Sequence, residues 1–290
     1  MKHHALSRFP AVALAAGLTF LSTADKASGS VVLTFDDPPV LDAPGGWVVD
    51  RYAPAIFQSA IVGGENVLEF GVSQDDRQGL RPSGFTTEFR NTQGRKLEDL
   101  PDFNRFASSD FLIPSTIPSG LPMSVGLWNR AGSTYPIIAY HQGISDTFVA
   151  PGGSNPYNAN FNGDGLYFWI TGNGWTPALT TASPGVTRDD FIDLWMTFRV
   201  DIDVDTDVFV YSVVDGDGNL LVGDSMPAGG QQNFQELFLN MTNWLTGDPD
   251  EPQTFSVFVD NVSYTPEPSR ALLISLALVP VLLRRRRAGA

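Results

Sequence analysis

The sequence contains no cysteine and little positive charge, and both shortages exclude classes of protein. Without cysteine the chain cannot form disulfides, bind a metal through thiolates, use a thiol nucleophile or carry a lipoprotein anchor. Between residues 30 and 264, ten Lys and Arg stand against 30 Asp and Glu, a net charge of −20. Nucleic acid is therefore not an expected partner, because binding a phosphate backbone needs clustered cations.

The composition that is present predicts an all-β domain. With 290 residues, of which 42% are hydrophobic, the chain can bury a sizeable core. Its 28 Gly, 21 Pro and 20 Phe are scattered among short runs rich in Val, Phe and Tyr. This pattern is typical of many strands joined by tight turns. No linker is long enough to divide residues 30–264, so we expect one domain there.

The N-terminus has the layout of a secretory signal peptide. Lys2 and Arg8 precede an apolar stretch of about 13 residues, Phe9 to Leu21. The small residues of Ser22-Thr23-Ala24 then provide a cleavage site. We expect residues 1–29 to be a signal peptide and leader, and the working domain to be exported.

The C-terminus has three parts in a fixed order. Pro266-Glu267-Pro268 is followed by an apolar stretch at 271–283, and then by Arg284, Arg285, Arg286 and Arg287. The positive-inside rule places this basic cluster on the cytoplasmic side of a membrane. The apolar stretch is shorter than the roughly 20 residues of a full span, and Pro280 interrupts it. It therefore suits a transient signal better than a permanent anchor.

These three parts resemble the PEP-CTERM sorting signal of exported proteins in bacteria that make extracellular polysaccharide. The resemblance implies that residues 265–290 are recognised and cut by an exosortase near Pro266, Glu267 and Pro268. The protein would be tethered to the inner membrane before processing, and would then reach the cell surface or the extracellular matrix. A plain tail anchor is the alternative.

Strands separated by turn signals fill the middle of the chain. In residues 197–204, Phe198, Val200 and Ile202 alternate with polar residues, so one face of this strand should be buried. A dozen strands in one domain require two packed sheets. The expected strands are Val31–Phe35, Asn66–Val72, Gly84–Arg90, Phe103–Ile113, Ser124–Trp128, Tyr135–His141, Leu166–Thr171, Leu194–Val204, Val208–Val214, Asn219–Asp224, Glu236–Asn240 and Thr254–Tyr264.

Three stretches resemble the concanavalin-A-like or laminin-G-like jelly roll: residues 163–168, the hairpin at 195–211, and the closing run at 255–264. Carbohydrate-binding modules of related fold are an equally good comparison. The resemblance implies a two-sheet antiparallel jelly-roll sandwich over residues 30–264.

Carboxylates at the two ends of this domain predict a cation site. Asp36 and Asp37 end the first strand, and Asp260 lies in the last. First and last strands of a jelly roll often lie side by side, and grouped carboxylates suit a structural Ca²⁺. Carboxylates that simply face water are the alternative. An EF-hand at 215–226 is excluded, because Leu220 and Met226 occupy positions that need Gly and Glu.

Aromatic residues in polar loops are the candidate sugar contacts, because flat rings pack against pyranose faces. An Asn-rich loop at 152–162 contains Tyr157 and Phe161, Trp175 follows glycines, and Trp244 follows Asn243. Each of these rings has a second interpretation, which is packing over the rim of a sheet.

Catalysis is the alternative hypothesis. The E-x-D-x-x-E strand of laminarinase-type hydrolases is absent. Segments containing Arg90 and His141 resemble motifs of jelly-roll alginate lyases, but the Lys-containing strand of those enzymes has no counterpart. We interpret His141 as a half-buried structural residue. The preferred hypothesis is a surface or matrix protein that binds neutral carbohydrate without catalysis. A polysaccharide lyase or glycoside hydrolase and a purely structural matrix protein are the alternatives.

Overall fold

A computed structural model describes residues 30–73, 92–143, 162–170, 174–243 and 254–265. Within these residues, the only helical element is a single 3-10 turn, Arg188–Asp190, and no helix is long and apolar enough to cross a membrane. The strands are β1 (Val31–Leu33), β2 (Val48–Val49), β3 (Ile56–Val62), β4 (Glu65–Ser73), β5 (Thr92–Leu97), β6 (Phe106–Leu112), β7 (Met123–Arg130), β8 (Ile137–Gln142), β9 (Gly165–Ile170), β10 (Gly174–Thr180), β11 (Trp195–Asp203), β12 (Val208–Asp215), β13 (Leu220–Pro227), β14 (Glu236–Asn243) and β15 (Thr254–Tyr264).

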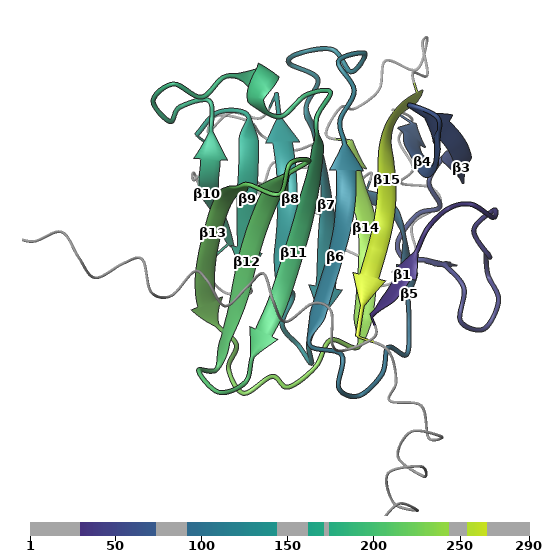
Figure 1. Cartoon of the computed structure of the whole chain (residues 1–290), viewed down its shortest axis with the longest axis vertical. Coiled ribbons are helices and arrows are strands. Elements are labelled where there is room, and N and C mark those ends of the chain that lie inside the picture. The colour runs from purple at the N-terminus through teal and green to yellow at the C-terminus, as the bar shows by residue number, and fades with distance from the viewer. Residues whose placement is uncertain (1–29, 74–91, 144–161, 171–173, 244–253, 266–290) are drawn as a thin grey trace, which may run out of the picture.

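The strands form two antiparallel sheets that pack face to face (Figure 1). The front sheet has the order β13-β12-β11-β6-β15-β4-β3, and β1 lies beside β15. The back sheet has the order β10-β9-β8-β7-β14-β5-β2. This arrangement confirms the predicted all-β, two-sheet jelly-roll sandwich.

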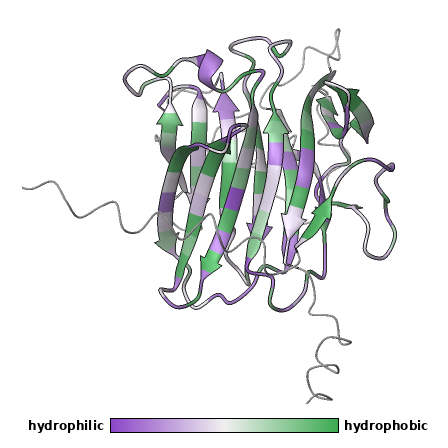
Figure 2. Ribbon diagram, in the orientation of Figure 1, coloured by the Kyte–Doolittle hydropathy of each residue, from purple (hydrophilic) through white to green (hydrophobic). Residues whose placement is uncertain are grey.

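The core between the sheets follows from residues that alternate along the strands, as the colours of Figure 2 illustrate. In β11, Phe198, Val200 and Ile202 are buried, while Arg199 and Asp201 are only half-buried. The alternation expected for this strand is therefore confirmed. Phe198 stacks on Phe111 of β6 with ring centroids 4.7 Å apart, and both rings are fully buried.

Four of the strands, which are β2, β3, β5 and β10, were not predicted from the sequence. β5 and β10 show why a strand can be missed. β5, with the sequence TQGRKL, lacks an apolar pattern, yet five of its six residues are buried. Its inward Gln93 makes two hydrogen bonds with the backbone of Ser73 in β4. β10 contains Pro177, which its position at the edge of the sheet tolerates. β2 and β3 complete the set, and the predicted strand Gly84–Arg90 lies outside the described residues.

The first and last strands lie side by side, as predicted. β1 pairs with the C-terminal end of β15, with Val31 opposite Tyr264. The register of β15 against β6 shifts between Asp260 and Ser263, and Asn261 has a φ of 48° there. A bulge of this kind turns side chains away from the regular alternation.

We expect Phe198→Ala to lower the free energy of unfolding by about 3–5 kcal/mol, because it leaves a cavity opposite Phe111. Chemical denaturation of the full chain measures this change. Leu194→Ala is the control, because Leu194 is 47% exposed, and it should change stability by less than about 0.5 kcal/mol. Equal effects of the two substitutions would contradict this description of the core.

Candidate functional site

A row of large apolar side chains crosses the outer face of the back sheet. The register places one residue from each of five adjacent strands in line, from β14 through β7, β8 and β9 to β10. These side chains belong to a cluster separate from the core between the sheets. We call them the aromatic row: Phe238, Trp128, Ile137, Trp169 and Trp175.

Small residues lie beside the aromatic row. Gly94, Gly126 and Ala139 occupy the next outward positions, with Asn240 between the two glycines. A Cβ on Gly126 would lie 2.2 Å from the carbonyl oxygen of Ile138, and one on Gly94 would collide with the Asn240 amide oxygen. Close backbone packing and the Asn240 side chain therefore require glycine at these positions.

His141 lies within this face and not at its surface. Its ring packs edge-on against Tyr167 and Trp175, with centroids 5.0 and 4.3 Å away. The side chain is fully buried, which corrects the expectation of a half-buried histidine. Burial lowers the pKa of His141 well below its usual range, so the ring is neutral at pH 7.

Trp175 is not in a loop as predicted, but is the second residue of β10, opposite Trp169. The two rings meet edge-on at 5.4 Å, and Trp175 is only 6% exposed. The partly exposed rings of this face are Trp169 and Tyr135, neither of which was predicted. The alternating aromatics Tyr167 and Trp169 in β9 were the sequence signal that could have found this face.

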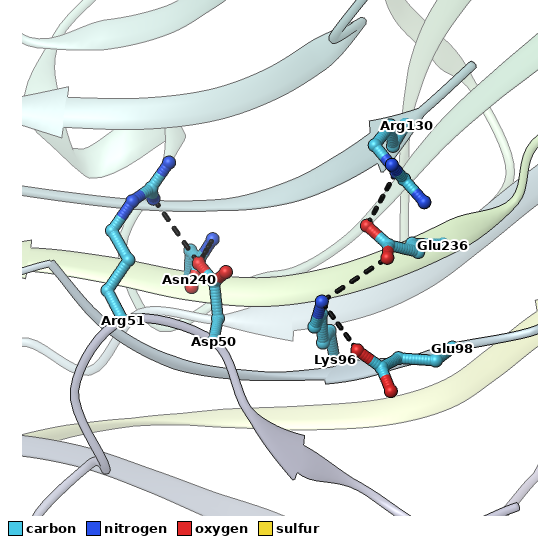
Figure 3. A network of polar contacts seen from close by, with 7 residues as sticks. All are labelled: Asp50, Arg51, Lys96, Glu98, Arg130, Glu236 and Asn240. Carbon is cyan, nitrogen blue, oxygen red and sulfur yellow. Dashed lines mark hydrogen bonds and ion pairs between the residues drawn. The ribbon is translucent and has the colours of Figure 1, made fainter. Parts of the chain in front are cut away.

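Ion pairs lie beside the aromatic row on the β14 side, and Figure 3 shows the charged residues that form them. Glu236 accepts from Lys96 at 3.2 Å through one oxygen, and from Arg130 at 2.8 Å through the other. Lys96 also contacts Glu98 at 2.6 Å, and its ammonium lies 5.7 Å from the centre of the Phe238 ring. Both oxygens of Glu236 are thus occupied by cations.

A second polar group reaches the same face from the segment after β2. The Asn240 amide donates to Asp50 at 3.1 Å, and Asp50 pairs with Arg51 at 3.3 Å. The Arg51 guanidinium lies over Trp128, 4.9 Å from the ring centre. Burial lowers the pKa of Arg51, while the Asp50 carboxylate opposes that shift.

Carboxylates gather on the outer face of the front sheet, at the bulge of β15. Asp260 lies directly opposite Asp110, which accepts hydrogen bonds from Thr197 and Asn261. Partial burial is the main cause that raises the pKa of Asp260, and the negative charges of Asp110, Asp36 and Glu65 add to it.

The predicted calcium ligands are only partly brought together. Asp36 and Asp260 are close enough to interact electrostatically, whereas the backbone carbonyl of Asp37 accepts from Ser59. Across the described segments, no group of three or more His, Asp or Glu side chains is arranged to hold a metal ion. As placed, Asp36, Asp37 and Asp260 do not form such a site, and calcium stays a prediction.

Other predicted site residues lie outside the described residues: Arg90, Tyr157, Phe161, Trp244 and the sorting residues from Pro266 to Arg287.

No family model and no curated protein matches this chain. Among solved structures, it is similar to a GH131 β-glucanase catalytic domain from Podospora anserina (TM-score 0.41, 11% identity, 76% of this chain and 85% of that one). It is also similar to an alginate lyase (TM-score 0.41, 10% identity, 83% of this chain and 98% of that one). Lectin II from Ulex europaeus is a third similar structure (TM-score 0.38, 9% identity, 74% of this chain and 95% of that one). Similarity at this level carries no inference about function, and the fold assignment rests on the sheet topology.

We expect Asp260→Asn to stabilise the protein at pH 7 by up to about 1 kcal/mol, because it removes a partly buried charge and its repulsion by the opposed Asp110. Because the pKa of Asp260 is raised in the fold, its ionisation costs stability as pH rises through that pKa. The gain should disappear below its ordinary pKa of 3.8, where both forms are neutral. Melting temperatures of wild type and Asp260→Asn, measured from pH 7 to below pH 3.8, give the difference in stability.

The same variant tests the calcium prediction. A bound Ca²⁺ would raise the melting temperature of the wild-type protein, a chelator would lower it, and Asp260→Asn would lose that response. Melting curves that chelator leaves unchanged would contradict a structural calcium at these residues.

Proposed function

We propose that the outer face of the back sheet binds neutral carbohydrate without catalysis. The observation that supports this proposal is the aromatic row beside Asn240, Asp50 and Glu236. Rings of this kind pack on the apolar faces of pyranoses, while amide and carboxylate groups hydrogen-bond to hydroxyls. The partly exposed Trp169 and Tyr135 are the contacts that a sugar would reach first.

The charges around the row favour a neutral ligand. In the described part of this face, Arg51, Lys96 and Arg130 each contact a carboxylate, so positive and negative charges balance there. An acidic polysaccharide would need cations that are free to pair with its carboxylates. A domain of net charge −20 also repels a polyanion.

The arrangement gives less support to the catalytic alternative. A glycoside hydrolase needs a carboxyl group that can reach the glycosidic oxygen, but both oxygens of Glu236 contact cations. A lyase needs a base within hydrogen-bond reach of a substrate proton, but His141 is fully buried among aromatic rings. Lyase or hydrolase activity, and a purely structural matrix role, are therefore outcomes for the binding experiment to detect.

We also propose that the protein is an exosortase substrate of the PEP-CTERM type. The support comes from the sequence, in which Pro266-Glu267-Pro268, an apolar stretch and four arginines follow one another. Export would place the carbohydrate-binding face next to extracellular polysaccharide. Sorting and sugar binding would then act together to hold the protein at the surface or in the matrix.

We expect Trp169→Ala to weaken binding to a neutral polysaccharide by about tenfold, the equivalent of about 1.4 kcal/mol. The measurement is a glycan-array screen of the full chain, followed by titration of the best ligand, with product release scored on the same glycans. Trp195→Ala is the matched control, because Trp195 is a half-buried tryptophan on the front sheet. Shortened or unsaturated products would instead establish an enzyme, and absence of both binding and products would favour a structural role.

We expect the double substitution Pro266→Ala with Glu267→Ala to abolish C-terminal processing in a host that has an exosortase. Immunoblotting of membrane and surface fractions would show the unprocessed form retained in the membrane. Substituting Pro280, within the apolar stretch, is the control for a general effect of proline loss. Normal processing of the double variant would contradict the sorting proposal.

A further inference from the structure

Cations lie over two rings at one end of the aromatic row. The Arg51 guanidinium lies over Trp128, and the Lys96 ammonium lies over Phe238. Trp128 is only 9% exposed, whereas Trp169, two strands away in the same row, is partly exposed. Phe238, Ile137 and Trp175 are buried as well, so Trp169 is the one partly exposed member of the row, and the cations lie over the rings at the other end.

Arg51 reaches Trp128 from a backbone that is fixed to the edge of the sheet. The Asp50 N–H donates to the Gly94 carbonyl at 3.1 Å, and the Gly94 N–H donates to the Tyr52 carbonyl at 2.9 Å. Gly94 lies in β5, and Trp128 lies in β7 on the far side of β14. The Arg51 side chain therefore spans β14, as Figure 3 shows beside Asp50 and Asn240.

A guanidinium that lies over an indole covers surface that a pyranose ring would use. We propose that Arg51 occupies a carbohydrate subsite above Trp128 and thereby restricts a bound glycan to the Trp169 end of the row. Arg51 is then a residue that determines specificity, because it sets how many sugar units the face accepts. This inference rests on the proposed carbohydrate function of the same face.

The cap is formed by the Arg51 side chain alone. Its contact with Trp128 depends on side-chain torsions of Arg51, whereas residues 50 and 52 hold the backbone on Gly94. Burial disfavours the charged form of Arg51 and lowers its pKa, and the negative charge of Asp50 opposes this shift only in part.

The first test needs no ligand. The full chain is labelled with 5-fluorotryptophan, and the Trp128 resonance is assigned with Trp128→Phe. Arg51→Ala should increase the H2O-to-D2O shift of the Trp128 fluorine signal and leave that of Trp169 unchanged. Arg199→Ala is the matched control, because Arg199 lies 4.7 Å over Phe106 on the front sheet and pairs with Asp201. An unchanged Trp128 shift in Arg51→Ala would overturn the cap.

The second test measures the length of the binding face, with laminaribiose and laminarihexaose as probes. Arg51→Ala should bind the hexaose about tenfold more tightly than wild type does, because a subsite is added, and should bind the biose equally. The hexaose affinity of Arg51→Lys should equal that of wild type or lie between those of wild type and Arg51→Ala. Hexaose binding that is detected for Arg51→Ala but not for wild type would also support the cap.

The remaining outcomes separate the two proposals. Wild-type binding that Arg51→Ala leaves unchanged at both lengths would overturn the subsite and leave the carbohydrate function intact. Weaker binding by Arg51→Ala would overturn it as well, because Arg51 would then be a ligand contact. Absence of binding to either sugar by wild type and variant, together with an empty glycan array, would overturn the carbohydrate function and the subsite with it.

Discussion

The back sheet is apolar on both faces, and the rest of the structure is arranged around that constraint. Its inner face packs Val125, Leu127 and Tyr140 into the core, and its outer face carries the aromatic row. All six residues of β8 are buried, whereas β11 of the front sheet alternates between buried and half-buried residues. Large apolar patches are unfavourable in water, and four of the five side chains of the aromatic row are less than 10% exposed.

Charges are arranged differently on the outer faces of the two sheets. On the front sheet, Asp110 and Asp260 face each other across adjacent strands; partial burial disfavours the charge of Asp260, and repulsion by Asp110 adds to that effect. On the back sheet, each cation near the aromatic row contacts a carboxylate. An acidic protein can therefore offer a locally balanced charge, which suits an uncharged ligand better than a polyanion.

Much of the fold could be predicted because the strands of the front sheet alternate with a period of two. The inward side of β11 followed from this alternation, whereas the pairing of the first and last strands was expected from the jelly-roll resemblance. β5 escaped prediction because four of its five buried positions are Thr, Gln, Gly and Arg; Gln93, for example, hydrogen-bonds to the backbone of Ser73, which is distant in sequence. β10 was not predicted because its Gly174 and Pro177 indicate a turn. A proline is tolerated in a strand at the edge of a sheet, but the sequence does not show which strand is at the edge.

The candidate site was predicted in part. His141 and Trp175 were singled out one at a time, yet they contact each other, and Trp128 and Trp169 were overlooked. The sequence by itself determined the all-β class, the acidic surface, the alternating strands and the signals expected at both ends. Only the tertiary structure decided which aromatic residues share a face and that Arg51 covers one of them. Those contacts depend on the register of five strands that are separated along the chain, and local patterns carry no information about that register.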